Sequence, residues 1–237
     1  MSPAPSSAAK FDASRAGEYA AQSRIALAGY EACHELAACV LYSALGQGSA
    51  ARILVGGAGG TAQEILVAAP LEPGWHFTAV DPSPPMLASA QAAVDAAGLS
   101  NRAAWHLGTV EDLPEQEPFD AATLIGVLHH VPGEEAKLAL LKGIAARLHP
   151  GAPLILAGNR GAYASRPLFL KAWATRWRMV GASEDDVQAK IGKILQGADP
   201  PSSTEEVEQL LKLAGFEEAE LFFSSLFWGA WVARRSA

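Results

Sequence analysis

The spacing of apolar residues changes near residue 50 of the chain. Between residues 12 and 46 they recur every three or four positions, with a break at Gly29 and a stop at Gly46, which predicts two helices. From Arg52 onward, short apolar runs alternate with longer segments of helical periodicity. This pattern predicts strands at 52–56, 75–80, 104–108, 119–126 and 152–158, with helices at 61–69, 86–98 and 134–148.

This alternation is typical of βαβ units, so we expect an α/β fold with a doubly wound, mostly parallel sheet. The last third differs. Residues 161–197 carry helical patterns, 202–215 form a well-signalled helix, and 216–235 hold two strands that pair antiparallel across a tight connection. We therefore expect a leader and covering helices at 1–49, followed by one domain at 50–237. Within that domain, a helical segment at 160–200 precedes the last two strands.

Composition narrows the class of protein. The 237 residues are 50% hydrophobic and 18% charged, with a net charge of −7, which argues for a folded core and against nucleic acid as the main ligand. Cys33 and Cys39 fit buried thiols better than a disulfide or metal site. No signal peptide pattern opens the sequence, and the most apolar stretch, Leu221 to Ala233, is too short to span a membrane. These features predict a soluble, cytoplasmic protein.

A glycine cluster follows the first predicted strand and opens a helix. Residues 57–62 satisfy the relaxed G-x-G-x-x-G/A pattern, in which glycines bring backbone N–H groups close to a ligand. Asp81 follows Gly59 by 22 residues, at the end of the second strand, where a carboxylate can accept ribose hydroxyls. Loop and acid together predict an adenosine cofactor. A packing glycine loop and a turn-forming aspartate remain the alternatives, and a nicotinamide enzyme would need proton-relay residues that we do not find.

Several motifs together resemble the class I S-adenosylmethionine-dependent methyltransferase family. They are ILVGGAGG, VDPSPPML, GTVEDLP, FDAATLIGVLHHVP, RLHPGAPLILAG and the paired terminal strands. The resemblance implies a seven-stranded sheet of order 3-2-1-4-5-7-6 with the last strand antiparallel. Within the family, the chain is similar to carboxy-S-adenosylmethionine synthases at Phe11-Asp12, Gly29-Tyr30, 212–223 and 227–235.

The resemblance also implies a cofactor site. Its glycine loop would face the methionine part, Asp81 the ribose hydroxyls, and the residues after the third strand the adenine edge. The residues implied are Gly57, Ala58, Gly59, Asp81, Pro82, Met86, Thr109, Val110, Glu111, Ile125 and Gly126. No metal is expected.

Departures from the family pattern affect the expected reaction. Val55 and Thr61 stand where the family usually has an acid and a third glycine, and Thr109 stands where an acid is common. Leu210 replaces the arginine with which carboxy-S-adenosylmethionine synthases hold a carboxylate. We therefore expect ordinary methyl transfer to an unidentified, small-molecule acceptor. A carboxy-S-adenosylmethionine synthase-like enzyme and a non-catalytic cofactor-binding module are the alternatives.

Candidates for catalysis and acceptor binding come from three segments. His129 and His130 follow the fourth strand, where an imidazole could act as a general base. Tyr19, Arg24 and Tyr30 belong to the N-terminal helices, from which a tyrosine could close over a sulfonium. The alternative for each is packing.

The third segment, 167–180, places Phe169, Trp173 and Trp177 four residues apart, with basic residues on other faces. It could form an acceptor lid, contact RNA, pair with a second copy in a homodimer, or pack on the sheet.

Overall fold

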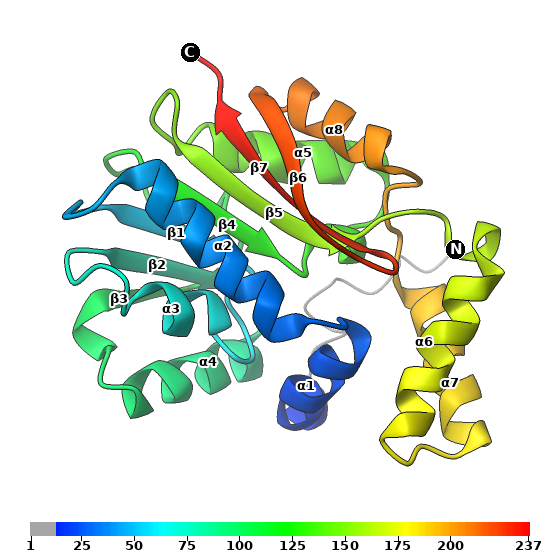
Figure 1. Ribbon diagram of the computed structural model, residues 1–237. Helices are drawn as coiled ribbons and strands as arrows, with labels where there is room; N and C mark the ends of the chain where they lie inside the picture. The colour runs from blue at the N-terminus through cyan, green and yellow to red at the C-terminus, as the bar shows by residue number, and fades with distance from the viewer. Residues whose placement is uncertain (1–12) are drawn as a thin grey trace.

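The computed structural model describes residues 13–237, and the predicted leader and the Phe11-Asp12 pair lie outside them. The described chain contains one seven-stranded sheet of order β3-β2-β1-β4-β5-β7-β6 (Figure 1). β7 runs antiparallel to both of its neighbours, and the other pairs are parallel. The strands are β1 Arg52–Gly56, β2 His76–Asp81, β3 Ala103–Leu107, β4 Ala121–Ile125, β5 Pro153–Asn159, β6 Phe216–Ser225 and β7 Trp228–Arg235.

Helices cover both faces of the sheet, as right-handed crossovers require. One face packs on α2, α3 and α4, and the other on α5 and α8 (Figure 1). Successive strand residues point to opposite clusters: Ile53 and Val55 face the first, and Leu54 faces the second. The helices are α1 Ala13–Ala26, α2 Tyr30–Leu45, α3 Gln63–Ala68, α4 Pro84–Ala96, α5 Glu134–Ala145, α6 Pro167–Met179, α7 Glu184–Gly197 and α8 Thr204–Leu213.

Three helices lie beyond the edges of these layers. α1, α6 and α7 gather near the end of the sheet where the parallel strands finish (Figure 1). A third cluster holds α6 and α7 against the turn between β6 and β7 through Tyr163, Trp173, Trp177, Val187 and Phe227. Since the carboxyl ends of parallel strands are where α/β proteins bind ligands, these helices cover the functional end of the sheet.

The predicted α/β fold is confirmed, including the strand order that the family resemblance implied. Element ends differ by a few residues. The helix predicted at 61–69 begins only at Gln63, because Ala62 before it has a left-handed φ of 47°. The prediction of two buried thiols was wrong for Cys39, which lies on the exposed side of α2, whereas Cys33 is buried. Among residues 13–237, no helix has the length and apolar character needed to cross a membrane.

Candidate functional site

A small pocket opens at the carboxyl ends of β1, β2 and β4. It encloses about 80 Å³. Its walls come from the loop after β1, the end of β2, the start of α4, the segment after β4 and one residue of α1. The lining residues are Tyr19, Gly57, Gly59, Asp81, Pro82, Ser83, Met86, Ile125, Gly126, Val127, His130 and Val131.

The glycine loop is tied to β2 through its backbone. The N–H groups of Gly57 and Ala58 both donate to the Val80 carbonyl, at 2.8 and 3.0 Å. Gly57 has a φ of +69°, and a Cβ there would lie 2.1 Å from Cγ2 of Val127. A Cβ on Gly59 would lie 2.4 Å from Oδ2 of Asp81. Only glycine therefore allows the loop to pass this close to β2 and to the segment after β4.

Asp81 links the loop to the turn that starts α4. Its Oδ2 accepts a hydrogen bond from Gly59 N at 2.9 Å, and its Oδ1 accepts one from Ser83 N at 2.8 Å. Burial raises the pKa of the Asp81 carboxyl, while these two N–H bonds oppose the rise. A carboxylate has about four acceptor positions, so about two remain for the hydroxyls of a ligand.

Seven of the eleven residues expected at the cofactor site line this pocket: Gly57, Gly59, Asp81, Pro82, Met86, Ile125 and Gly126.

Ala58 is expected at the site but is fully buried in the core, so only its backbone belongs to the loop.

The three residues expected at the adenine edge lie outside the pocket lining. The Thr109 hydroxyl donates to Asp112 at 2.8 Å, and Val110 is buried in the core. The Glu111 carboxylate lies against Gly143 of α5. Contact of these residues with a ligand stays a prediction.

The two histidines after β4 lie in different environments. His129 is buried, packs edge-on against Trp228 with ring centroids 5.4 Å apart, and accepts a 3.4 Å hydrogen bond at Nδ1 from Asn159 N. Burial, reinforced by His130 and Lys137, holds the pKa of His129 well below its usual range. His130 is partly exposed and lines the pocket. Of the two predicted bases, only His130 faces the space where a ligand would lie.

An ion pair between a buried lysine and a largely exposed aspartate fixes the segment that carries these histidines. Lys137 of α5, only 3% exposed, pairs with Asp199 at 2.7 Å. The same carboxylate accepts from Gly133 N at 2.7 Å, and Asp199 N donates to the His129 carbonyl. Asp199 therefore joins the chain after α7 to the pocket wall after β4.

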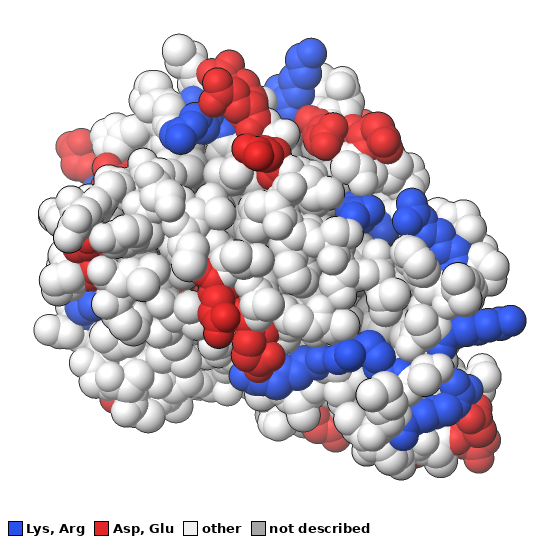
Figure 2. Space-filling view, viewed as in Figure 1, with Lys and Arg blue, Asp and Glu red and all other residues white. Residues whose placement is uncertain are grey.

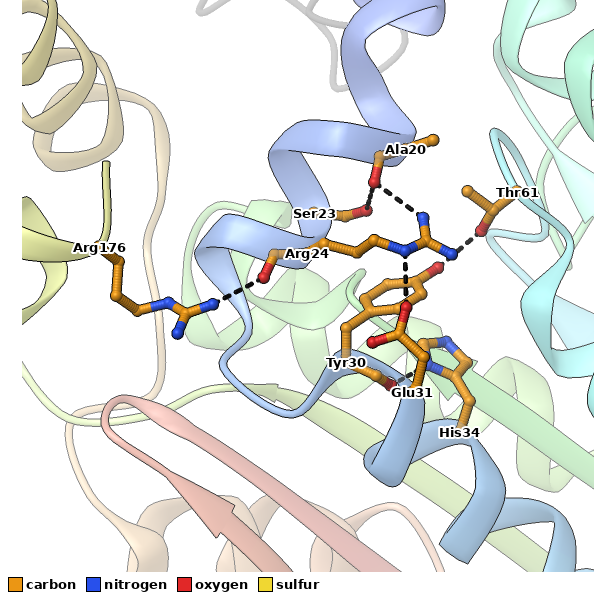
Figure 3. A network of polar contacts seen from close by, with 8 residues as sticks. All are labelled: Ala20, Ser23, Arg24, Tyr30, Glu31, His34, Thr61 and Arg176. Carbon is orange, nitrogen blue, oxygen red and sulfur yellow. Dashed lines mark hydrogen bonds and ion pairs between the residues drawn. The ribbon is translucent and has the colours of Figure 1, made fainter. Parts of the chain in front are cut away.

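Of the three candidates from the N-terminal helices, only Tyr19 lines the pocket. Tyr19 of α1 reaches the pocket, where a Cβ on Gly60 would lie 2.4 Å from its ring. Tyr30 instead bonds the Thr61 hydroxyl at 2.7 Å (Figure 3). Burial raises the pKa of Tyr30 to about 12. Arg24 lies over the Tyr30 ring and pairs with Glu31, so both residues connect helices rather than line the pocket.

The aromatic residues of α6 pack inside the chain. The Trp173 indole donates to the Ala26 carbonyl at 2.7 Å, and Phe169 packs on Phe227. Neither residue lines the pocket.

The basic residues of the same region also have partners within the chain. Figure 2 shows positive side chains gathered toward the α6–α7 end of this face. Arg176 donates to the Arg24 and Ile25 carbonyls (Figure 3), and Arg178 pairs with Glu184. Arg176 thus packs α6 against the end of α1, as the packing alternative implies. An acceptor lid, an RNA contact and a homodimer through this segment stay predictions.

Sequence reasoning missed three residues of the pocket wall: Ser83, Val127 and Val131. Ser83 stands inside the D-P-S-P turn, which was itself a signal, and caps α4 by accepting from Met86 N. The two valines flank the histidine pair, and no local pattern distinguishes them from core residues.

No group of three or more His, Cys, Asp or Glu residues is arranged to hold a metal ion within the described part of the chain.

The comparison of the sequence with known families agrees with this geometry. Residues 54–154, from β1 into β5, match the family described as "Methyltransferase domain". That segment is similar to methyltransferase domains. No curated protein matches the chain.

Solved structures share the fold across most of the chain at low identity. A candidate O-methyltransferase from Nostoc punctiforme PCC 73102 has a TM-score of 0.62 at 16% identity, covering 85% of this chain and 55% of its own. Human N-acetylserotonin methyltransferase, solved in complex with SAM, has a TM-score of 0.56 at 18% identity, covering 87% and 55%. The chain thus spans about half the length of these proteins.

The fold is the class I methyltransferase fold. A third neighbour shows that this fold does not fix the reaction. The [4+2]-cyclase SpnF has a TM-score of 0.61 at 17% identity, covering 86% of this chain and 81% of its own. The reaction must therefore be argued from the site.

Proposed function

We propose that the chain is an S-adenosylmethionine-dependent methyltransferase that acts on a small-molecule acceptor. The observation that carries the proposal is the junction of the glycine loop with Asp81, in which Gly59 N donates to Oδ2 at 2.9 Å. This junction holds a carboxylate at the end of β2 with acceptor positions free for a ribose diol. The match of residues 54–154 to the methyltransferase domain family supports the same proposal.

The cofactor is S-adenosylmethionine, whose sulfonium supplies both the methyl group and its leaving group. The chain then has to bind, orient and exclude water. Asp81 holds the ribose, Pro82 and Met86 pack on the adenine, and the loop from Gly57 to Gly59 approaches the methionine part. Ile125 and Gly126 border the same space from β4, next to the reacting end.

Tyr19 narrows this site from the α1 side. The pocket encloses about 80 Å³, well below the several hundred Å³ of a typical ligand site. The Tyr19 ring lies against Gly60 and reaches toward Gly126, so its side chain fills space that the cofactor needs. A bound cofactor would therefore meet the Tyr19 ring, and an aromatic ring at this place would favour the positive sulfonium.

His130 is the candidate general base. It lines the pocket, whereas His129 is buried and engaged by Asn159 N. A base at this position would take a proton from an acceptor that approaches from the β4 side.

Carboxymethylation of the cofactor has less support. The position expected to carry an arginine is Leu210 of α8. Its side chain is 1% exposed and packs in the core between α8 and the sheet. The solved structures described above include methyltransferases and a cyclase, but the carboxy-S-adenosylmethionine synthase resemblance rests on sequence motifs alone.

Mass spectrometry of the ligand released from the purified full chain tests this function. We expect S-adenosylmethionine or S-adenosylhomocysteine. A nicotinamide dinucleotide would contradict the proposal, and a cofactor heavier by one carboxylate would favour carboxymethylation. Formation of S-adenosylhomocysteine with a panel of small phenols, alcohols and amines then tests turnover. Tight cofactor binding without turnover on any panel member would favour a non-catalytic module.

A further inference from the structure

Buried polar atoms without hydrogen-bond partners concentrate at one place in the described structure, the junction of β5 and β7. Six buried side-chain nitrogen or oxygen atoms lack a partner, and four of them belong to Asn159, Arg160, Trp228 and Trp231. Such atoms cost free energy when they are buried unpaired. Arg160 lies over the Trp231 ring, and Trp231 belongs to the core on one face of the sheet, whereas Asn159 and Trp228 pair at the carboxyl end of β5. The unpaired atoms of Asn159 and Trp228 indicate a place that a polar group completes.

Asn159 and Trp228 are the two members on the pocket side of the sheet. They are direct partners in the antiparallel register of β5 and β7, so their side chains are neighbours on one face. The Asn159 amide nitrogen donates to the Tyr163 hydroxyl at 2.8 Å, which leaves Oδ1 as an unpaired acceptor. The Trp228 indole N–H is an unpaired donor. They are 6% and 9% exposed, and they do not bond each other.

This pair adjoins the cofactor pocket. A Cβ on Gly126, a pocket residue, would lie 3.7 Å from the Trp228 indole ring and 3.9 Å from the Tyr19 hydroxyl. His129 packs on the same indole and receives the Asn159 backbone N–H. The Trp228 atom nearest to Gly126 is Cη2, at the far end of the ring, so Trp228 joins the pair to the pocket wall formed by Gly126.

We propose that Asn159 and Trp228 form a subsite that holds a hydroxyl group of the methyl acceptor. The inference rests on the proposed function and adds the chemical class of the acceptor to it. A hydroxyl donates one hydrogen bond and accepts others, so it satisfies the Asn159 oxygen and the Trp228 N–H together. A carboxylate would face the Asn159 oxygen with a lone pair, and an ammonium would face the indole N–H with another donor. The subsite therefore selects a neutral hydroxyl compound.

Indole N–H resonances of the full chain report directly on this subsite. The six tryptophans give six signals after labelling with ¹⁵N-tryptophan, and Trp228→Phe assigns one of them. We would saturate the protein with S-adenosylhomocysteine and titrate it with phenol, toluene, benzoate and benzylamine. Phenol is expected to shift the Trp228 signal most, with toluene about tenfold weaker because it lacks the hydroxyl.

Two variants complete the test. Asn159→Leu is expected to weaken phenol binding about tenfold. Trp231→Phe is the matched control, because it removes an unpaired indole N–H from the opposite face of the same strand and should leave phenol binding within about twofold.

Several outcomes would overturn the proposal. A Trp228 signal that no probe moves would indicate a purely structural pair, and equal shifts with toluene would indicate an apolar wall. A larger response to benzoate would show that the amide presents its NH₂ group. Only the assignment of the Trp228 signal needs a folded variant, and the titrations themselves use the unmodified chain. If S-adenosylhomocysteine itself fails to bind, the proposed function fails separately, and the phenol titration of the unliganded chain still tests the subsite.

Discussion

The two halves of the candidate site are built in different ways. On the cofactor side, the loop after β1 and the end of β2 contribute backbone N–H groups, glycines and one carboxylate, all within residues 56–86. On the acceptor side, His130 follows β4 and Trp228 begins β7, so the two residues come from distant parts of the sequence. The first half is a local backbone structure that tolerates little change. The second depends on the packing of side chains from separate elements and can vary with the acceptor.

Because the loop tolerates little change, we expect the largest loss of ligand affinity from a substitution at Gly59. A Cβ there would lie 2.4 Å from the Asp81 carboxylate and 2.6 Å from Cβ of Met86, so Gly59→Ala must displace Asp81, the acid proposed to hold the ribose. We expect a loss of S-adenosylhomocysteine affinity of about a hundredfold by calorimetry, comparable to one strong hydrogen bond to a charged group. Gly192→Ala is the control, since nothing lies within 4 Å of its added Cβ. Equal affinity of both variants for S-adenosylhomocysteine would show that the glycine loop does not contact the cofactor.

Asp81→Asn should have the next largest effect, between about tenfold and a hundredfold in affinity, because a charged acceptor is lost. The affinity of the unmodified chain should fall in acid. Burial raises the pKa of Asp81, so the carboxylate becomes protonated at a higher pH than an exposed aspartate, and its protonated form accepts fewer hydrogen bonds. Calorimetry across pH would show this fall in the unmodified chain and not in the variant. A pH profile shared by both would contradict the role of Asp81.

The same contrast explains how much of the molecule sequence alone could predict. The glycine loop and Asp81 were predictable because they match a recurring motif, in which an acid at the end of the second strand follows the loop at a set spacing. Helix signals such as the Ser203 cap of α8 are local. The Trp173 indole instead donates to a carbonyl 147 residues away, and the Asn159 N–H meets His129 across 30 residues. Their packing roles follow from tertiary contacts that no short pattern records.

On the acceptor side, the two neighbouring histidines should respond differently. His129→Ala leaves the buried Asn159 N–H unpaired and removes the contact with Trp228, so we expect the free energy of unfolding to fall by about 2–3 kcal/mol. His130→Ala should change it by less than about 0.5 kcal/mol while lowering turnover. Denaturant titrations measure both. A larger loss of stability in His130→Ala than in His129→Ala would contradict the structural role given to His129.

The low pKa of His129 gives this residue a pH signature. Its folded-state pKa lies well below 6.5, because burial disfavours its charged form. The unfolded chain therefore binds the proton first, and stability is full above pH 6.5 and falls as the pH decreases. This acid loss should be smaller in His129→Asn than in the unmodified chain. If the free energy of unfolding falls equally with decreasing pH in both proteins, groups other than His129 cause the loss.

A smaller effect is expected where the chain after α7 is tied to the pocket wall. Asp199→Asn leaves Lys137 buried without its counter-ion and should lower the free energy of unfolding by about 1–2 kcal/mol, less than for a fully buried pair because Asp199 is 57% exposed. The hydrogen bond from Lys137 lowers the pKa of Asp199, so the difference should vanish as the pH falls through that value. Glu184→Gln, which breaks an exposed pair with Arg178, is the control and should leave the free energy of unfolding unchanged.

The smallest effect belongs to Tyr19, which lies between the two halves of the site. Tyr19→Ala should raise both the association and the dissociation rate of S-adenosylmethionine by roughly threefold, because the space is open but the cation–π contact is lost. Tyr19→Phe keeps the ring and should behave as the unmodified chain does. Stopped-flow fluorescence measures these rates. Unchanged rates in Tyr19→Ala would show that its ring does not limit entry.

Equilibrium titration with S-adenosylhomocysteine tests the central claim, that the loop and Asp81 form the cofactor site, most directly. We predict one site per chain with micromolar-range affinity, lost in Gly59→Ala and retained in Gly192→Ala. Absence of binding to the folded, unmodified chain, or binding that Gly59→Ala leaves intact, would contradict the account.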